Sequence, residues 1–368
     1  MPLMPQFSKD LLSWFKKYAR EMPWRGEKNP YKIWLSEIML QQTQVDTVRP
    51  YYERWLKKFP QVASVARAKE DEVLKLWEGL GYYARCRNFQ KACQQVVKDF
   101  NGKVPSRLED LKTLKGIGPY TLAAVGSIAF GHVVACIDGN IKRVIARVLA
   151  LDVPPSQGLL QIETFLNKNI SKKYPGTFNE ALMDLGATIC VPKNPKCLIC
   201  PVQKHCKAFE TKTVDVYPKP EKKLERPHYQ IAVGVVWKGN KILVSKRKSK
   251  GLLGGLWEFP GGKIQKGETS AACAAREVKE EVGVDVEVGS SIGKIKHQFT
   301  HFSIEMEAFV CKYMKGRPRA IECEAWKWIQ LQEISNFAFP KANHKLFPKL
   351  PKTNPFLRGR KSDPLFKM

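Results

Sequence analysis

Apolar residues recur at spacings of three and four from residue 7 to about residue 210, which is the period of amphipathic helices. Turn-forming pairs such as Asn29-Pro30 and Asn101-Gly102 interrupt this pattern at intervals. This part of the chain is therefore predicted to be all-helical. The expected helices cover residues 7–18, 34–45, 73–80, 89–100 and 122–130.

The pattern changes after Tyr229, where short runs of β-branched residues replace the helical period. Runs at 231–237 and 241–245 flank Gly239-Asn240, a pair typical of a hairpin turn. This second region is predicted to be an α+β domain. Further strands are expected at 284–288, 303–311 and 324–329, and a helix at 270–281.

A charged segment with two prolines lies between the two regions, at 214–223, and is expected to be an extended, mobile linker. The sequence thus predicts a multi-domain protein. Its expected parts are a helical domain over 1–212, a linker over 213–228, an α+β domain over 229–350 and a basic, disordered tail over 351–368.

The composition adds a strong bias of charge. Apolar residues make up 43% of the 368 residues, which is enough material for real cores. The 62 Lys and Arg residues outnumber 35 acids and leave a net charge of +27. Such an excess destabilises a folded chain by self-repulsion unless a polyanion balances it, so nucleic acid is the expected partner.

No apolar run reaches the ~18 residues that span a bilayer, and the first residues lack the pattern of a signal peptide. We therefore expect no membrane association and a cytoplasmic, reducing compartment. In that compartment, the ten cysteines are expected to be thiols or metal ligands rather than disulfides.

Four cysteines form one C-x6-C-x2-C-x5-C run, at Cys190, Cys197, Cys200 and Cys206. Four thiols this close together indicate a metal centre, either a zinc site or an iron–sulfur cluster. A zinc site could use His205 in place of one cysteine. The other cysteines are scattered and are expected to pack in cores.

Gly116 and Gly118 flank one apolar residue between two expected helices. Glycine at both positions would allow positive φ in a tight turn and close approach of another molecule to the backbone. The helix expected to begin near Thr121 would offer unpaired N–H groups to a phosphate. Asp138 comes twenty residues after Gly118, at the end of an apolar run. The pattern fits either a phosphate grip with a nearby carboxylate or an ordinary helical turn with a capping Asp.

Glu37 is the single acid in the mostly apolar helix expected at 34–45. Apolar neighbours would desolvate its carboxyl group, raise its pKa toward neutrality and make it a proton donor. The alternative is an exposed Glu that faces solvent. A protonated Glu37 and a charged Asp138 would form the pair of acids that cleavage of a glycosidic bond requires.

The second region contains a motif that fits the Nudix box, G-x5-E-x7-R-E-U-x-E-E-x-G-U, at every fixed position over residues 262–284. Three of its glutamates share one face of the expected helix, where Mg²⁺ would bind beside substrate phosphates. A solvated acidic helix would explain these glutamates but not the fixed glycines and Arg276. The three candidate Mg²⁺ ligands are Glu277, Glu280 and Glu281.

Taken together, these residues resemble the MutY family of adenine DNA glycosylases, over residues 7–345. The resemblance implies a helix–hairpin–helix glycosylase domain with a 4Fe-4S cluster on the four cysteines, followed by a MutT-like Nudix domain. It implies base-excision repair of adenine mispaired with 8-oxoguanine or guanine in duplex DNA. We expect a monomer in a bacterial cytoplasm, associated with the nucleoid. The matching segments are 23–25, 36–43, 77–83, 115–120, 138–140, 178–181 and the four cysteines.

The resemblance also implies roles for single residues. Glu37 would protonate the leaving adenine and Asp138 would stabilise, or transiently bond to, the oxocarbenium sugar, with Tyr120 and Asn140 in support. The expected adenine pocket is lined by Trp24, Arg25, Leu40 and Glu180. The expected DNA contacts of this domain are Gly116, Gly118, and Gln42 and Tyr82, which would wedge into the duplex where the flipped base leaves a gap.

Tyr120 stands where related glycosylases that also nick the strand have a lysine nucleophile. We therefore expect base removal without efficient strand cleavage. Lys142 lies two residues beyond Asn140 and could condense with the abasic sugar in a side reaction.

The second domain departs from the family, in which the Nudix box is usually eroded and the domain senses 8-oxoguanine. Here the box is complete, and residues 256–263 resemble the MutT family of 8-oxo-dGTP hydrolases. The sensor loop is still present at Phe299-Thr300-His301, and Thr300 and His301 are expected DNA contacts. We expect 8-oxoguanine recognition as the main role, with Mg²⁺-dependent hydrolysis of 8-oxo-dGTP-like nucleotides as the alternative.

Two rival functions are a nucleotide hydrolase that the helical domain only tethers to DNA, and a DNA sensor without catalysis. The complete Nudix box favours the first rival. The presence of both Glu37 and Asp138 argues against both rival functions.

Overall fold

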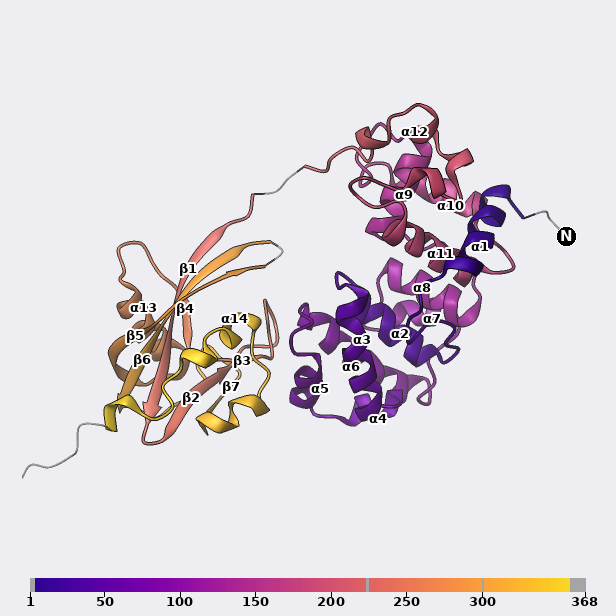
Figure 1. The fold of residues 1–368 in the computed structure, drawn as a ribbon. Coiled ribbons are helices and arrows are strands. Elements are labelled where there is room, and N and C mark those ends of the chain that lie inside the picture. The colour runs from indigo at the N-terminus through magenta and orange to yellow at the C-terminus, as the bar shows by residue number, and fades with distance from the viewer. Residues whose placement is uncertain (1–3, 223–224, 300, 358–368) are drawn as a thin grey trace, which may run out of the picture. The chain divides into compact units, whose positions relative to one another are not determined.

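The computed structural model describes residues 4–222, 225–299 and 301–357 (Figure 1). The chain divides into two compact units, one of residues 1–67 and 88–223 and the other of residues 68–87 and 224–368. The first is all-helical and the second contains a β-sheet, as the sequence predicts. The domain limits at 212 and 228 stay predictions. Thr300 and residues 358–368 of the expected tail lie outside the described residues.

The helices predicted over 7–18, 34–45, 89–100 and 122–130 are present in the first unit with shifted ends, and this unit has further helices that no predicted range covers. The helices of this unit are α1 (Gln6–Tyr18), α2 (Pro30–Leu40), α3 (Val45–Lys58), α4 (Val62–Arg67), most of α6 (Tyr83–Asp99), α7 (Leu108–Thr113), α8 (Pro119–Phe130), α9 (Gly139–Leu149), α10 (Leu159–Asn169), α11 (Pro175–Thr188) and α12 (Lys207–Glu210). Helix α5 (Glu70–Trp77) belongs to the second unit.

Helix α2 is buried along most of its length because eight of its eleven residues are shielded from solvent. Its start is set by Asn29, whose side chain accepts a hydrogen bond from the backbone N–H of Tyr31, and by Pro30 in the first turn. The prediction of one helix over 34–45 is wrong at its end. The helix stops at Leu40, and Gln42 has a left-handed backbone with φ of 57°.

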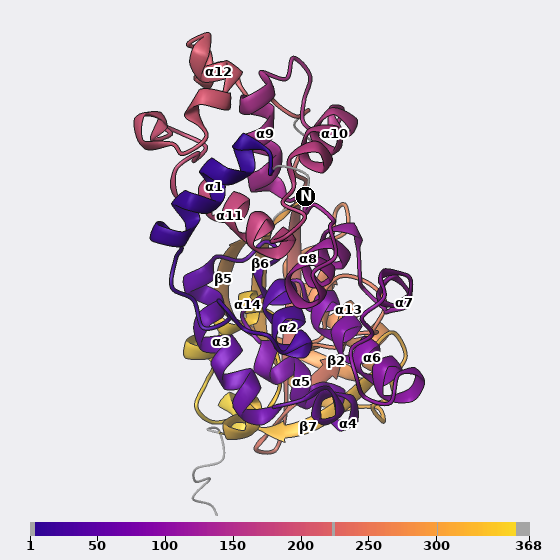
Figure 2. The ribbon, with the colours of Figure 1, turned by 90° about the vertical axis from the view of Figure 1, so that its right-hand side faces the viewer.

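Helix α11 lies among α1, α8 and α9, and these helices share one apolar core with α10 (Figure 2). Phe7 and Leu11 of α1 and Phe178 of α11 are among its buried side chains. A second, aromatic cluster forms around Phe89, with Trp34 at a ring distance of 4.7 Å. These two cores hold the ends of α2, α8, α9 and α11 in fixed relative positions.

The second unit is built on a seven-stranded sheet with the order β3-β2-β1-β6-β5, in which β4 also pairs with β1 and β7 with β2. Its strands are β1 (His228–Lys238), β2 (Lys241–Lys246), β3 (Trp257–Glu258), β4 (Gly261–Lys263), β5 (Asp285–Gln298), β6 (Ser303–Lys315) and β7 (Ala325–Gln330). The predicted hairpin is confirmed, since β1 and β2 are antiparallel with Trp237 opposite Ile242. Strands β1 and β6 are parallel, and β5 is much longer than predicted.

Residues on strand β1 are buried on both faces of the sheet. Val233 and Val235 face a core that includes Phe339 and Leu346, next to the short helix α14 (Lys341–His344). Ala232 and Val236 face the opposite core, which is covered by α13 (Ser270–Val282). The alternation follows from the two-residue period of a strand, and it makes β1 a central strand.

The segment expected to be a mobile linker is partly anchored on the helical unit. The Tyr217 hydroxyl donates to Asp152 Oδ1 at 2.7 Å, and Glu221 accepts from the N–H and the hydroxyl of Ser156 at 2.9 and 2.5 Å. Within the described residues, no helix is long and apolar enough to cross a bilayer.

Candidate active site

A cleft of about 1410 Å³ opens in the helical unit where the ends of α2, α8, α9 and α11 meet. It brings together residues that are far apart in the sequence. Its lining includes the whole predicted catalytic group, the whole predicted adenine pocket and three predicted DNA contacts. These residues are Glu37, Tyr120, Asp138, Asn140, Trp24, Arg25, Leu40, Glu180, Gln42, Gly116 and Gly118.

The two glycines at the rim of this cleft differ in their backbone conformation. Gly116 has φ of +82°, as a tight turn requires. Gly118 has φ of −91°, so the expectation of positive φ is wrong for this residue. It precedes α8, which begins at Pro119 rather than near Thr121. A Cβ atom at Gly118 would meet nothing within 4 Å, so its backbone is open to another molecule.

Glu37 lies on α2 and is only 5% exposed. Burial raises the pKa of its carboxyl group to about 7, with smaller upward effects from the charges of Glu180 and Asp138. A hydrogen bond from Tyr120 and the charge of Arg25 act in the opposite direction on this pKa. The expectation of a desolvated acid is thus met in the structure, and near neutral pH Glu37 can hold a proton for donation.

Asp138 is the N-cap of α9, and its Oδ1 accepts a hydrogen bond from the backbone N–H of Ile141 at 2.7 Å. The two alternatives drawn from the sequence are therefore compatible, because the same carboxylate caps a helix and lines the cleft. Burial raises the pKa of Asp138, while backbone N–H groups of Ile141 and Asn140 and the charge of Arg143 oppose that rise. These donors favour its charged form.

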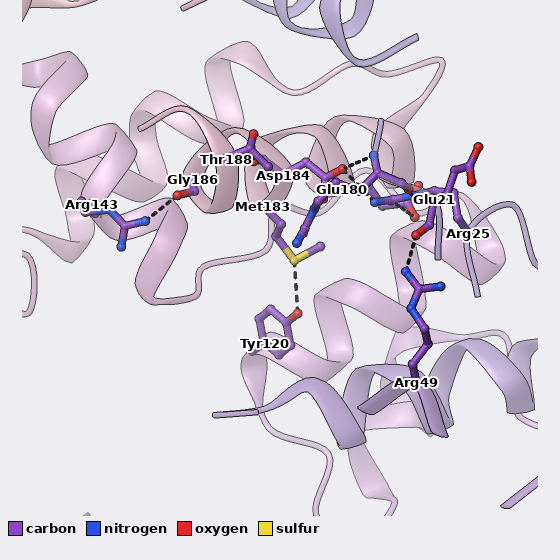
Figure 3. Close-up of polar contacts among 11 residues, drawn as sticks. Glu21, Arg25, Arg49, Tyr120, Arg143, Glu180, Met183, Asp184, Gly186 and Thr188 are labelled. Carbon is purple, nitrogen blue, oxygen red and sulfur yellow. Dashed lines mark hydrogen bonds and ion pairs between the residues drawn. The ribbon is translucent and has the colours of Figure 1, made fainter. Parts of the chain in front are cut away.

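The Tyr120 hydroxyl lies 2.7 Å from Glu37 Oε2 and 3.3 Å from Met183 Sδ (Figure 3 shows the contact with Met183). Burial raises the pKa of Tyr120 well above its usual value, and the charge of Glu37 adds to that effect. Tyr120 is therefore a neutral phenol that can donate a hydrogen bond to an ionised Glu37.

An ion-pair cluster forms the wall of the cleft on the side of α11 (Figure 3). Arg25 Nη1 lies 2.5 Å from Glu180 Oε1, and Arg25 Nη2 lies 3.0 Å from Asp184 Oδ2. Asp184 also binds Arg20 and is missing from the sequence-based prediction. It stands four residues after Glu180, on the same face of α11, and that spacing is the signal that could have identified it.

Arg143 is a second residue that the prediction missed. Its Nη2 donates to Asn140 Oδ1 at 2.9 Å and to the Gly186 carbonyl at 2.7 Å. Its Nε donates to the Cys190 carbonyl at 2.9 Å. One guanidinium group thus fixes the side chain of Asn140 and also contacts the cysteine loop.

The two predicted wedge residues share an unusual backbone. Gln42 has φ of 57° and Tyr82 has φ of 49°, a left-handed conformation that is uncommon for residues other than glycine. Gln42 lines the cleft, whereas Tyr82 belongs to the other unit and lies 5.2 Å from the Arg85 guanidinium. Strained backbones of this kind gather at functional positions, although they do not identify the function.

The four predicted metal ligands, Cys190, Cys197, Cys200 and Cys206, line one small pocket together with Arg147. Arg147 Nη1 lies 3.4 Å from Cys190 Sγ, and burial raises the pKa of Cys200 to about 12. His205 does not line this pocket and instead lies 2.9 Å from Asp10 Oδ2. The arrangement favours a centre held by four sulfurs over one that uses His205.

The carboxylates of the Nudix box are paired with protein groups. Arg276 Nη1 lies 2.8 Å from Glu277 Oε1 and 2.7 Å from Glu280 Oε2, and Arg276 Nε lies 2.7 Å from Glu268 Oε1. Glu281 instead accepts a hydrogen bond from Ser245 at 3.0 Å. Over residues 4–222, 225–299 and 301–357, no three His, Cys, Asp or Glu side chains converge on a single ion site.

The absence of three converging side chains among the described residues has different consequences for the predicted Mg²⁺ site and the predicted 4Fe-4S site. An Mg²⁺ ion at the Nudix box requires its carboxylates to leave Arg276 and converge. A 4Fe-4S cluster takes four separate cysteine ligands and needs no such convergence on one point. At the predicted sensor loop, His301 is exposed between β5 and β6, and Thr300 lies outside the described residues.

Comparisons with known proteins agree with this arrangement. A model of the HhH-GPD superfamily of base excision DNA repair proteins matches residues 35–168, and a NUDIX domain model matches residues 232–349. The solved structure of a thermostable thymine-DNA glycosylase superposes with a TM-score of 0.52 at 29% identity, over 56% of this chain and 95% of that chain. The predicted fold class is therefore confirmed.

Relatives of known function match along most of the chain. The adenine DNA glycosylase of Rattus norvegicus is 31% identical over 397 residues, which cover 93% of this chain and 77% of the relative. That of Buchnera aphidicola subsp. Schizaphis graminum (strain Sg) is 30% identical over 346 residues, which cover 92% and 97%. With its acid-lined cleft and both domains matched, the chain belongs to the adenine DNA glycosylase family of base-excision-repair enzymes.

Proposed function

We propose that the protein hydrolyses the N-glycosidic bond of adenine mispaired with 8-oxoguanine or guanine in duplex DNA, without cutting the strand. The observation that carries this proposal is the shared cleft of Glu37 and Asp138, with the Tyr120 hydroxyl 2.7 Å from Glu37 Oε2. Glu37 can hold a proton near neutral pH, while backbone N–H groups stabilise the charge of Asp138.

The adenine must leave the base stack before these acids can reach it. Gly118 at the start of α8 leaves its backbone open, so N–H groups there can bind a phosphate of the flipped strand. Gln42 at the cleft and Tyr82 fill the gap in the duplex. The net charge of +27 supports binding to the DNA backbone.

In the chemical step, Glu37 gives its proton to the adenine ring, so the base departs as a neutral leaving group. The C–N bond breaks with its electron pair moving to adenine, and a positive charge develops on the sugar. Asp138 stabilises that charge as an ion pair or a transient ester, and water then adds to the sugar and gives one proton to the Glu37 carboxylate. Tyr120 stabilises the Glu37 carboxylate that remains.

The adenine pocket offers a donor and an acceptor side by side. The Arg25 guanidinium can donate to a ring nitrogen, and the Glu180 carboxylate can accept from the exocyclic amine of adenine. Trp24 is buried and supplies an apolar wall, and Leu40 lines the same cleft. A base that lacks the exocyclic amine would leave the free side of the Glu180 carboxylate without that donor.

The four cysteines fit a 4Fe-4S cluster, because four half-buried thiols and no His side chain line their shared pocket. Cys190, Cys197, Cys200 and Cys206 would hold it, and it would cross-link the loop that follows α11. Arg143 and Arg147 bind the backbone and sulfur of Cys190 and hold this loop against α9.

A direct test measures adenine release from a duplex with adenine opposite 8-oxoguanine, in single turnover, for the wild type and two variants. Glu37→Gln removes the proton donor and Asp138→Asn removes the charge, and each should slow base loss by about 10²- to 10⁴-fold. Strand scission without alkali, at the rate of base loss, would contradict the absence of strand cleavage. Full activity of Glu37→Gln would remove the basis of the mechanism.

For the sheet unit, we propose recognition of 8-oxoguanine in DNA, through Thr300 and His301, as the main role. The engagement of Glu277 and Glu280 by Arg276 supports this role over hydrolysis. The complete Nudix box favours the alternative activity, Mg²⁺-dependent cleavage of 8-oxo-dGTP. Mg²⁺-dependent cleavage by the wild type that disappears in Glu280→Gln would establish the alternative.

A further inference from the structure

The ion-pair cluster of the cleft contains one carboxylate that the mechanism above does not use. Asp184 lies on α11, one turn after Glu180, and is only 1% exposed (Figure 3). A buried carboxylate is costly unless several donors pair with it, so its partners carry information about its role.

Two arginines supply those donors. Arg20 donates to Asp184 three times, through its backbone N–H at 3.1 Å, its Nε at 3.0 Å and its Nη2 at 2.6 Å. Arg25 donates once, from Nη2 to Asp184 Oδ2 at 3.0 Å. Arg20 therefore supplies most of the pairing, and the contact with Arg25 is an additional one.

The additional contact fixes the orientation of Arg25. Its Nη1 is bound to Glu180 and its Nη2 to Asp184, so two carboxylates of the same helix hold the two ends of one planar group. Arg25 Nε also donates to the Arg20 carbonyl at 3.5 Å, and the guanidinium lies 4.9 Å from the Phe15 ring. With Glu180 as the single carboxylate partner, the Nη2 end of the guanidinium could still shift. With both, its plane and the free side of the Glu180 carboxylate are held in one geometry.

We propose that Asp184 is a positioning residue for base selection, which holds Arg25 so that Arg25 and Glu180 together bind the amine-bearing edge of the flipped adenine. The inference rests on the proposed use of this cleft as the adenine pocket. Asp184 itself does not touch the base. Its effect should therefore be largest on a base whose amine-bearing edge contacts both Arg25 and Glu180.

The test compares single-turnover removal of adenine and of unsubstituted purine, each opposite 8-oxoguanine. Purine lacks the exocyclic amine that Glu180 would accept from, but it keeps the ring nitrogens that Glu37 can protonate. In Asp184→Asn, adenine removal should slow by about 10²-fold, the scale of a misplaced binding group. Purine removal should slow less, by about tenfold at most, because purine keeps the ring nitrogen that Arg25 can donate to but has no amine to donate to Glu180.

Three variants separate positioning from packing. Thr188→Val removes the hydroxyl that donates to the Asp184 backbone carbonyl at 2.8 Å and leaves the carboxylate untouched, so the ratio of the two rates should stay as in the wild type. Arg20→Gln should lower the melting temperature but keep the ratio, because Arg25 still binds Asp184. Glu37→Gln should slow both bases together.

Each result has a definite meaning. An equal loss on adenine and purine in Asp184→Asn, or no loss on either, would overturn the positioning role. A change of ratio in Arg20→Gln as large as in Asp184→Asn would assign selection to the whole cluster and not to Asp184. If Glu37→Gln stayed active on both bases, the proposed mechanism would fail whatever Asp184 does. The ratio does not depend on the fraction of folded enzyme, so a less stable variant remains informative.

Discussion

Glutamates occupy both the cleft of the helical unit and the Nudix box of the sheet unit, but their surroundings shift the pKa of Glu37 and of Glu268 in opposite directions. In the cleft, burial raises the pKa of Glu37 to about 7, and its hydrogen-bond partner is the neutral hydroxyl of Tyr120. In the Nudix box, hydrogen bonds from Arg276 lower the pKa of Glu268 to about 2. One acid is prepared to carry a proton, whereas the other is held ionised.

The contrast comes from burial and from the nearest partner, and not from the fold class. Glu281 lies in the same Nudix box, yet burial and the charge of Glu258 raise its pKa to about 8. Its donor is the Ser245 hydroxyl, and Arg276 is bound to its neighbours. Glu277 is bound to Arg276, but burial still raises its pKa, so contact with the arginine and burial together set the charge of these glutamates.

The largest expected effect is on the pH dependence of base removal. Glu37 acts as an acid, so its protonated form is the active one. The rate should be near its plateau well below the pKa of about 7 and should fall as pH rises through that value. Above it, the loss should be about tenfold per pH unit, or about 100-fold two units higher. Single-turnover rates across this pH range measure the fall, and a pH-independent rate would show that Glu37 is not the acid whose protonation controls base removal.

Tyr120→Phe sharpens the same comparison with a smaller effect. The Tyr120 hydrogen bond lowers the pKa of Glu37, so its removal should move the fall in rate to higher pH. The plateau should drop by about tenfold, because the carboxylate left after proton transfer loses a donor. The pH–rate profiles of both proteins measure the two changes.

Tyr52→Phe is a matched control for that prediction. Tyr52 packs against Trp24 at a ring distance of 5.2 Å, and its buried hydroxyl has no hydrogen-bond partner among the described residues. Its loss should leave the midpoint of the profile unchanged. An equal shift in both variants would show that the effect is not specific to the contact with Glu37.

The smallest expected effect is at the Nudix box, in Arg276→Gln. Without the guanidinium, Glu268, Glu277 and Glu280 repel each other, and the melting temperature of the sheet unit should fall by roughly 2–4 °C at neutral pH. The pKa of Glu268 is lowered by folding, so this pair stabilises the fold above the usual pKa of about 4.5 and loses its effect as pH falls toward about 2.

Calorimetry at two pH values tests this prediction. The difference in melting temperature between wild type and Arg276→Gln should shrink in acid, because the glutamates become neutral and no longer repel each other. Lys279→Gln is the control, since its pair with Asp285 is exposed and should contribute little. A difference that is independent of pH would point to lost packing of Arg276 and not to charge.

Sequence patterns predicted the elements better than their ends. The predicted strands and the helix at 270–281 are present because alternation and helical period are local properties, whereas β3 and β4 were not predicted because two or three residues are too few to show alternation. The expected helix over 34–45 failed at Gln42, whose left-handed backbone reflects the turn that leads into α3. The same local reasoning could not foresee that β1 and β6 pair in parallel, because that contact joins residues about 75 positions apart.

The residues of the site were also predicted only in part. Glu37, Asp138 and the four cysteines were identified by their chemical type, spacing and resemblance to a family. Arg143 was missed because nothing in its local sequence marks it, and Asp184 was missed although it lies four residues after Glu180. Both bind partners on other segments, Arg143 at Gly186 and Asp184 at Arg25. The roles of all these residues stay predictions until the variants are measured.

By itself, the sequence determined the kinds of elements, the two chemistries that the chain could carry and the sign of its charge, because each is encoded in the spacing and type of neighbouring residues. Only the tertiary structure decided which charges meet. Tyr120 contacts Glu37 across 83 positions of sequence and Arg25 contacts Asp184 across 159. Those contacts depend on how the helices pack around their common cores, and they decide which carboxyl group keeps its proton.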